Sequence, residues 1–315
     1  MSKLVRIGVA GAGVFGGFHA SKIHDHPGAM LGGIFDADAG RAGALAERFG
    51  ARAFSDLSKF LDAVDAVIVA APASVHFDLA HAALSAGKHV FVEKPITLNL
   101  ADADALIGLA RARDLILQTG HQERYVADAA GLFARDVSPA KIDCVRRTAA
   151  SGRCEDVSVV LDLMIHDLDL VRRLTKTDLV TAEASGGAHE AAAKLMLGNG
   201  TIVSLRASRR ADAPERRMTM TYGDGDITFD FVTRELTGAA SPAIDADNPP
   251  LAFRDPLAFG ADRFISAINT GETPFVSGED GRAALAWALA IENAVDRHAQ
   301  REITIKKDQA TRRRA

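Results

Sequence analysis

Residues 5–23, VRIGVAGAGVFGGFHASKI, join a short apolar run to a helix-like pattern through spaced glycines. Gly11, Gly13 and Gly16 form a GxGxxG motif at this junction. Between a strand and a helix, such glycines permit a tight turn, a close approach of the backbone to a pyrophosphate, and close packing of the helix. The first helical turn also presents N–H groups to an anion. This stretch therefore predicts that the fold begins with a dinucleotide-binding unit.

An acidic residue further along supports the same interpretation. Asp36 ends the next apolar run, 20 residues after Gly16. A carboxylate there accepts hydrogen bonds from the adenine ribose and repels a 2′-phosphate, which favours NAD over NADP. Arg41 keeps NADP open, because a nearby arginine can accommodate that phosphate. We therefore expect NAD as the cofactor, with these candidate binding residues: Gly11, Gly13, Val14, Phe15, Gly16, Asp36 and Arg41.

The order of the remaining segments predicts the fold class. Strand-like and helix-like segments alternate up to about residue 120, as in a parallel sheet covered by helices. Later strand-like runs are separated by the hairpin-turn signals LGNGT (197–201) and YGDGD (222–226). The predicted fold is α/β: an N-terminal Rossmann dinucleotide-binding domain plus a C-terminal α+β domain with an open, mainly antiparallel sheet. We place these domains at residues 1–120 and 121–305, followed by a basic tail at 306–315.

Composition excludes several classes of function. The 315 residues are 48% apolar and 25% charged, as in an ordinary globular protein. The net charge of −4 gives no indication of nucleic acid or an anionic membrane as a partner. The sequence shows no signal-peptide pattern and no membrane-length apolar run, so we expect a cytoplasmic protein that acts on a small molecule. Two cysteines, Cys144 and Cys154, are too few for a disulfide framework or a cysteine-based zinc site.

The segment LDLMIHDLDLV (161–171) is an apolar helical pattern that carries a narrow polar stripe. Asp162, His166 and Asp169 fall at i, i+4 and i+7, within an arc of roughly 60°. An aspartate four residues from a histidine can hydrogen-bond it and fix its tautomer, which suits a general base. Two other interpretations stay open. The acids could face the positive end of the helix dipole, or the three side chains could hold a divalent metal ion.

A second candidate for chemistry lies in AGKHVFVEKPIT (86–97), where a predicted strand ends in Glu93, Lys94 and Pro95. Ligands bind outside the carboxyl ends of the strands of an open parallel sheet, so Lys94 is expected where a substrate meets the cofactor. The Lys94–Pro95 bond is also a candidate for cis geometry. Taken alone, the lysine could equally be a surface charge.

Together, the GxGxxG turn, AGKHVFVEKP and the Asp-x-x-x-His helix resemble the Gfo/Idh/MocA oxidoreductases over nearly the whole chain. The resemblance implies an NAD(P)-dependent oxidoreductase acting on CH–OH groups, with an open second-domain sheet that often forms an oligomer interface. It implies that Lys94, Asp162 and His166 are the catalytic residues. His166 would take the hydroxyl proton, Asp162 would hold the histidine or share its proton, and Lys94 would stabilise negative charge on the reacting oxygen.

The resemblance also extends to the cofactor. AAPASVHFDLA (70–80) resembles the cofactor-lining stretch of the family through Pro72 and His76. Glu93 and Lys94, at the end of the neighbouring strand, are further cofactor-binding candidates.

One departure from the family pattern points to a subgroup. Met164 stands where many sugar and polyol members have a glycine between the catalytic Asp and His. This variant, together with GHQERY (120–125) and PFVSGEDGRAAL (274–285), resembles the subgroup that oxidises UDP-N-acetylglucosamine at its 3-hydroxyl. The resulting 3-keto sugar nucleotide is destined for transamination to a diamino sugar, in lipid A biosynthesis.

A sugar nucleotide also needs cations for its diphosphate, and arginine matches phosphate oxygens best. The substrate-binding candidates are Lys94, Arg124, Arg147, Arg153, Asp162, His166 and Asp169. Alternatives are a dehydrogenase of a free sugar or inositol-like polyol, and a non-catalytic NAD-binding sensor. The presence of both Lys94 and His166 speaks against the sensor. The Rossmann signature and Lys94 supply a mechanism without a metal. AKLMLGNGTIVSL (193–205) offers apolar residues for an uncovered sheet face, so we expect a homo-dimer or homo-tetramer.

Overall fold

The computed structural model describes residues 4–149, 156–238 and 249–312, with side chains described up to residue 300. The chain forms two compact units. The first consists of Met1–Ala129 and Ile244–Leu285, and the second of Ala130–Ala243 and Ala286–Ala315. Each unit contains one β-sheet.

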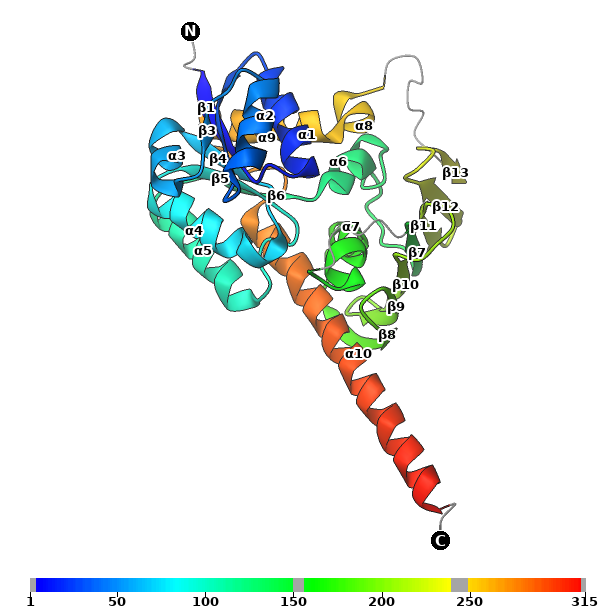
Figure 1. The fold of residues 1–315 in the computed structure, drawn as a ribbon. Helices are drawn as coiled ribbons and strands as arrows, with labels where there is room; N and C mark the ends of the chain where they lie inside the picture. The colour runs from blue at the N-terminus through cyan, green and yellow to red at the C-terminus, as the bar shows by residue number, and fades with distance from the viewer. Residues whose placement is uncertain (1–3, 150–155, 239–248, 313–315) are drawn as a thin grey trace. The chain divides into compact units, whose positions relative to one another are not determined.

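The first unit is built on a six-stranded sheet with the order β3-β2-β1-β4-β5-β6 (Figure 1). Every pair of neighbouring strands is parallel, as the alternating sequence pattern predicts. The order reverses at β1 and β4, so the carboxyl ends of these two strands form the position where open α/β sheets bind ligands. The strands are β1 (Val5–Ala10), β2 (Ala29–Phe35), β3 (Ala53–Phe54), β4 (Ala66–Val69), β5 (His89–Glu93) and β6 (Leu117–Gly120).

Helices cover both faces of this sheet (Figure 1). One face is covered by α1 (Val14–His24), α2 (Ala39–Arg48) and α9 (Pro256–Thr270), and the other by α3 (Leu57–Ala63), α4 (His76–Ser85) and α5 (Leu100–Ala112). The short helices of this unit are the 3-10 turn Ala73–Val75, α6 (Gln122–Ala129) and α8 (Leu251–Arg254).

The helix α9 lies far along the chain from the sheet against which it packs. Its residues Phe264 and Ile265 share one apolar core with Ile7 of β1 and Ile23 of α1. Residues 249–285 therefore group with the Rossmann sheet, whereas the division drawn from the sequence places them in the second domain. The burial of these apolar side chains holds the segment there, and the order of elements along the chain does not indicate it.

The second unit contains a seven-stranded sheet with the order β13-β12-β11-β7-β10-β9-β8. All its pairings are antiparallel except β7 with β10, so the sheet is mainly antiparallel, and the predicted fold class is confirmed. Both Gly-containing turn signals lie in hairpins, β9–β10 and β11–β12. The strands are β7 (Lys141–Arg147), β8 (Leu179–Gly186), β9 (Glu190–Leu197), β10 (Ile202–Ser208), β11 (Glu215–Tyr222), β12 (Gly225–Asp230) and β13 (Leu236–Gly238).

The polar-stripe segment packs on this sheet as a helix with two parts. A π-helical turn, Val160–Met164, leads into α7, Ile165–Thr175. Figure 1 labels α7. The π-turn is wider than an α-turn, so it alters the angular spacing that a regular helix would give the stripe. Such turns are frequent at functional sites. The last helix, α10, runs from Gly278 to Arg312 and includes most of the segment that the sequence set apart as a tail.

The strand β9 shows the alternation of a sheet with one covered face. Ala191, Ala193, Leu195 and Leu197 are buried, whereas Met196 is 46% exposed. The buried set faces the core, and the intervening residues form the opposite face. Within the described residues, no helix combines the length and apolarity that a bilayer span requires.

Candidate active site

The turn after β1 has the backbone geometry that its glycines require. Gly11 has a φ of 109°, and its N–H donates to the Phe35 carbonyl at 2.8 Å. A Cβ on Gly11 would collide with the Ala70 carbonyl, and one on Gly16 would collide with the Gly11 carbonyl. A Cβ on Gly13, in contrast, would meet nothing within 4 Å, so the backbone there faces open space. This open cradle at the start of α1 fits the pyrophosphate of a dinucleotide.

Val14 and Phe15 begin α1 beside that turn. No acidic residue lies in the first turn of α1, and no side chain caps its N-terminus. The first N–H groups of the helix therefore have no acceptor within the helix and can bind an anion. Phe15 is 43% exposed and packs edge-on against Phe18, with ring centroids 5.9 Å apart.

Asp36 is held as an anion at the end of β2. One carboxylate oxygen accepts the Ala12 N–H at 2.8 Å, and the other accepts the Asp38 N–H and the Arg41 guanidinium, both at 2.9 Å. Burial acts to raise the pKa of Asp36, but these hydrogen bonds hold that pKa below the usual aspartate value. Arg41 is thus the ion-pair partner of Asp36, with a side chain that is 61% exposed.

Replacement of Asp36 by alanine should reduce the preference for NADH over NADPH. The carboxylate both binds ribose hydroxyls and repels a 2′-phosphate, and its loss also frees Arg41 to meet that phosphate. A hydrogen bond to a charged group contributes roughly 1.5–3 kcal/mol, so the affinity ratio should fall about tenfold or more. Fluorescence titration with NADH and NADPH measures the ratio. Asp38→Asn, which changes the neighbouring acid, is the control; an unchanged ratio in Asp36→Ala would remove Asp36 from cofactor selection.

His76 forms hydrogen bonds with the segments that follow β4 and β5. Its ring is 1% exposed, and its Nδ1 and Nε2 lie 2.8 Å from the Pro95 carbonyl and 2.9 Å from the Ala71 carbonyl. Burial, the largest influence, lowers the pKa of His76. The peptide bond between Lys94 and Pro95 is cis, which confirms the geometry suggested by the sequence. His76 therefore supports the loop that carries Pro72, and its direct contact with a cofactor stays a prediction.

Glu93 is buried directly before Lys94, at 5% exposure. Its Oε1 lies 2.7 Å from His19 Nε2 and accepts a hydrogen bond from Gln122 Nε2 at 2.6 Å. Burial acts to raise the pKa of Glu93, but the hydrogen bond and charge of His19, followed by the charges of Lys94 and His76, make the net shift a lowering. The stabilisation from this carboxylate is therefore present above the usual glutamate pKa and is lost as the pH falls through the lowered value.

In the second unit, the aspartates near His166 in sequence have different partners. Asp162 accepts a hydrogen bond from Arg209 Nε at 3.1 Å, and Arg209 also donates to the Val157 carbonyl at 2.7 Å. Asp167 forms a buried ion pair with Arg146 of β7, whose guanidinium donates to both carboxylate oxygens at 2.8–3.2 Å. Asp167 therefore anchors α7 to the sheet.

Asp169 is fully buried, and His166 is half-buried. Among the residues that the structure describes, no group of three or more His, Cys, Asp and Glu side chains is placed to hold a metal ion. The guanidinium beside Asp162 further disfavours a metal ion there, because two cations would compete for one carboxylate.

Replacement of Arg209 by methionine should lower the free energy of unfolding by about 3 kcal/mol, because it leaves the carboxylate of Asp162 buried without this cation. Urea denaturation measures the loss. Arg210→Met alters the exposed neighbour and should have little effect. Adding Asp162→Asn to Arg209→Met should recover part of the loss, since it removes the charge that Arg209 no longer offsets. Equal stability of the Arg209 and Arg210 variants would contradict this account.

The predicted phosphate-binding arginines differ in their surroundings. Arg124 is 3% exposed, and its NH1 pairs with Asp280 at 2.8 Å. Arg147 follows Arg146 on β7, points to the opposite face of the sheet, and pairs with Glu215 at 3.6 Å. Arg153 lies outside the described residues. Arg124 and Arg147 already have carboxylate partners, and their contact with a diphosphate stays a prediction.

Sequence reasoning missed four residues of these networks: His19, Gln122, Arg146 and Arg209. His19 lies three residues after the last glycine of the motif, and Gln122 two residues after the end of β6. Both positions are near predicted strand or turn ends, which is a weak indication that they lie close to the site. Arg146 and Arg209 carried no signal beyond strand alternation.

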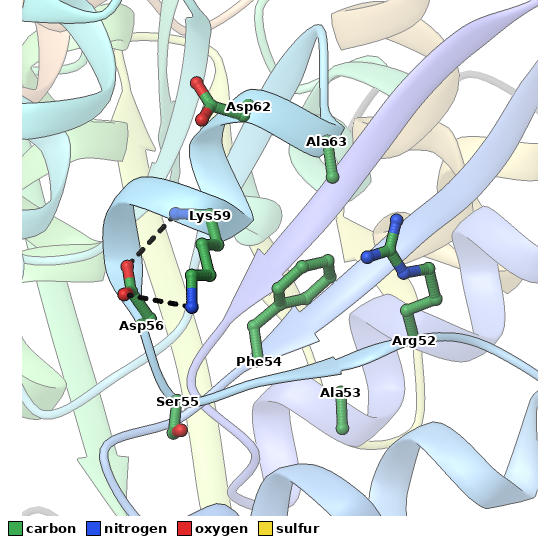
Figure 2. Close-up of a pocket in the computed structure, with 8 residues that line it drawn as sticks. All are labelled: Arg52, Ala53, Phe54, Ser55, Asp56, Lys59, Asp62 and Ala63. Carbon is green, nitrogen blue, oxygen red and sulfur yellow. Dashed lines mark hydrogen bonds and ion pairs between the residues drawn. The ribbon is translucent and has the colours of Figure 1, made fainter.

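A separate open pocket of about 540 Å³ lies along β3 and α3 (Figure 2). Its lining mixes both signs of charge, and Asp56 accepts the Lys59 N–H at 3.1 Å (Figure 2). None of the residues singled out from the sequence lines it. The lining residues are Arg52, Ala53, Phe54, Ser55, Asp56, Lys59, Asp62 and Ala63.

Comparisons with known proteins agree with this geometry. A model of the Gfo/Idh/MocA oxidoreductase family, with an NAD-binding Rossmann fold, matches residues 5–121. The chain is 37% identical to UDP-N-acetylglucosamine 3-dehydrogenase of Acidithiobacillus ferrooxidans, over 94% of this chain and 99% of that protein. It is 29% identical to myo-inositol 2-dehydrogenase of Thermotoga maritima, over 93% and 96% of the two chains.

Solved structures show the same fold. The structure of the Acidithiobacillus ferrooxidans enzyme superposes with a TM-score of 0.86, covering 93% of this chain and 98% of that one. The structure of scyllo-inositol dehydrogenase from Lactobacillus casei, at 22% identity, has a TM-score of 0.80 over 94% of this chain and 98% of that one.

These matches extend over both units of the chain and confirm the predicted resemblance. Together with the glycine cradle and Asp36, they show an NAD(P)-dependent oxidoreductase that acts on CH–OH groups of a small molecule, with NAD as its cofactor. The chain is a member of the Gfo/Idh/MocA family of oxidoreductases.

Proposed function

We propose that this protein oxidises the 3-hydroxyl of UDP-N-acetylglucosamine to a ketone and reduces NAD. The main support is the 37% identity to a UDP-N-acetylglucosamine 3-dehydrogenase along 94% of the chain. The inositol dehydrogenases match over a similar length at lower identity, for example 29% and 32%.

The proposed chemistry removes a hydride and a proton from one secondary alcohol. NAD, when bound, supplies the hydride acceptor. His166 takes the hydroxyl proton through a ring nitrogen as the C–H bond breaks. Lys94 donates a hydrogen bond to the same oxygen and stabilises the negative charge that develops on it.

Asp162 has a narrower role than the sequence allowed. Its carboxylate is already held by the Arg209 guanidinium, with Nε 3.1 Å from Oδ2. We therefore assign Asp162 to orienting His166 or a substrate hydroxyl rather than to receiving the proton. Asp169 is fully buried, which favours a supporting role for this residue.

The wider setting is also part of the proposal. The product, a 3-keto sugar nucleotide, would be transaminated to a diamino sugar for lipid A, and the enzyme would work in the cytoplasm. It would act as a homo-dimer or homo-tetramer through the uncovered face of the second sheet. Light scattering after gel filtration measures the oligomeric state, and a monomer at micromolar concentration would contradict this last point.

The test of function is NADH formation by the purified protein with UDP-N-acetylglucosamine, UDP-glucose, N-acetylglucosamine and myo-inositol. We expect the highest kcat/KM with UDP-N-acetylglucosamine. A higher kcat/KM with myo-inositol would establish the second candidate, a polyol dehydrogenase, which the inositol-dehydrogenase relatives support. NAD binding without turnover of any substrate would favour the sensor.

A further inference from the structure

Two segments of the first unit that are distant in sequence, α1 and the junction of β6 with α6, converge on the carboxylate of Glu93. His19 reaches it from α1, Gln122 from the start of α6, and the backbone N–H of Lys94 lies 3.4 Å from Oε2. Gly120, at the end of β6, lies directly against the same group: a Cβ there would be 2.7 Å from Oε2. The carboxylate is therefore enclosed by parts of the chain that lie far apart in sequence.

The enclosure leaves one arrangement for His19. Its ring is 1% exposed and stacks edge-on against Phe91 with centroids 5.2 Å apart. If Nε2 were unprotonated, its lone pair would face the carboxylate oxygen at 2.7 Å, which is repulsive. Nε2 must therefore carry a proton and donate a hydrogen bond to Glu93.

A buried carboxylate at this place acts on the next residue. The titratable groups that face Glu93 are His19 from α1, His76 from α4 and Lys94 itself. The backbone N–H of Lys94 lies 3.4 Å from Glu93 Oε2, so the place of the carboxylate bears directly on the backbone of Lys94. The hydrogen bonds to Glu93 also restrain the strand end from which Lys94 extends.

We propose that His19 is a positioning residue: by donating a hydrogen bond to Glu93, it fixes the place of a carboxylate that holds the strand end from which Lys94 reaches the reacting oxygen. Gln122 shares this task as a second, neutral donor. The inference rests on the proposed catalytic role of Lys94. His19 touches neither substrate nor cofactor in this account and acts only through Glu93 and Lys94.

Two variants of His19 distinguish the effect of its hydrogen bond from the effect of its ring packing. His19→Phe keeps a ring that can stack on Phe91 but removes the donor, and His19→Gln restores an N–H donor at a similar reach. We expect His19→Phe to lower kcat about ten- to hundredfold, the scale of a small misplacement of a catalytic group. The KM and the affinity for NADH should change little, and His19→Gln should recover most of kcat. His24→Phe, at an exposed position on the same helix, is the control.

A cycle with Lys94→Met tests whether His19 acts through the lysine. His19→Phe should lower kcat in the wild-type background and have little further effect in the Lys94→Met background. Equal losses in both backgrounds would overturn the inference, since they would mean that His19 acts on the fold or the cofactor. If Lys94→Met alone keeps wild-type turnover, the proposed function fails. The single variant shows this outcome without reference to His19.

A measurement without substrate completes the test. The rate at which an amine-reactive reagent labels Lys94, read by mass spectrometry against Lys59 and Lys88, should differ several-fold from wild type in His19→Phe, because the side chain is displaced, and return toward wild type in His19→Gln. An unchanged rate in His19→Phe would overturn the inference whatever the substrate. If His19→Phe does not fold, His19→Phe with Glu93→Gln removes the uncompensated charge, and the same labelling decides.

Discussion

Replacement of Lys94 by methionine is expected to lower kcat roughly 100- to 1,000-fold, the usual cost of losing one donor that stabilises a developing oxyanion. Methionine keeps most of the length and apolar character of the side chain but cannot donate a hydrogen bond. The glycine cradle and Asp36 do not depend on Lys94, so the affinity for NADH should stay close to that of the wild type. Stopped-flow or steady-state NADH formation measures kcat, and fluorescence titration measures the cofactor.

The control for Lys94 is Lys59→Met, which removes an ammonium whose side chain is 78% exposed on α3 of the same unit. It should leave kcat unchanged. A Lys94→Met protein that binds NADH and keeps more than about a tenth of wild-type kcat would contradict the role assigned to this lysine, because a single lost donor should cost more.

Replacement of His166 by alanine is expected to lower kcat about 100- to 10,000-fold, the typical contribution of a general base. Added imidazole should restore part of the activity, since a small base can enter the space that the side chain leaves. The rescue should grow with the concentration of unprotonated imidazole and therefore with pH near neutrality. NADH formation at several imidazole concentrations measures it.

His81→Ala, at an exposed position on α4, is the matched control, and imidazole should not affect it. A large loss in His166→Ala without any rescue, accompanied by lower stability, would mean that His166 is structural. Lys94 and His166 are assigned to one hydroxyl group, so the loss in the double variant should be much smaller than the product of the single losses. Fully multiplicative losses would indicate that the two residues act independently.

The cofactor turn and the fold class could be predicted from the sequence because their causes are local. A collision between a Cβ and the backbone decides where glycine must stand, and this needs only the residues of one turn and its neighbouring strand end. Likewise, period-2 alternation and Gly-containing turns are enough to predict the hairpins β9–β10 and β11–β12.

The partners of the charged residues could not be predicted in the same way. His19 and Glu93 are 74 residues apart, Arg209 and Asp162 are 47 apart, and Arg146 and Asp167 are 21 apart. Each pair forms only because packing of a helix against a sheet brings the two side chains within hydrogen-bonding distance. The placement of α9 on the first sheet has the same origin.

The sequence by itself thus determined where the chain turns, which residues can approach a dinucleotide, and which groups are suited to move a proton. Only the tertiary structure decided which partners hold these groups. Glu93 differs from an exposed glutamate through burial and through His19, and Asp162 owes its ion pair to Arg209. Burial and electrostatic interactions depend on which groups are close together in space. Residues that are distant along the chain come close together only when the chain folds.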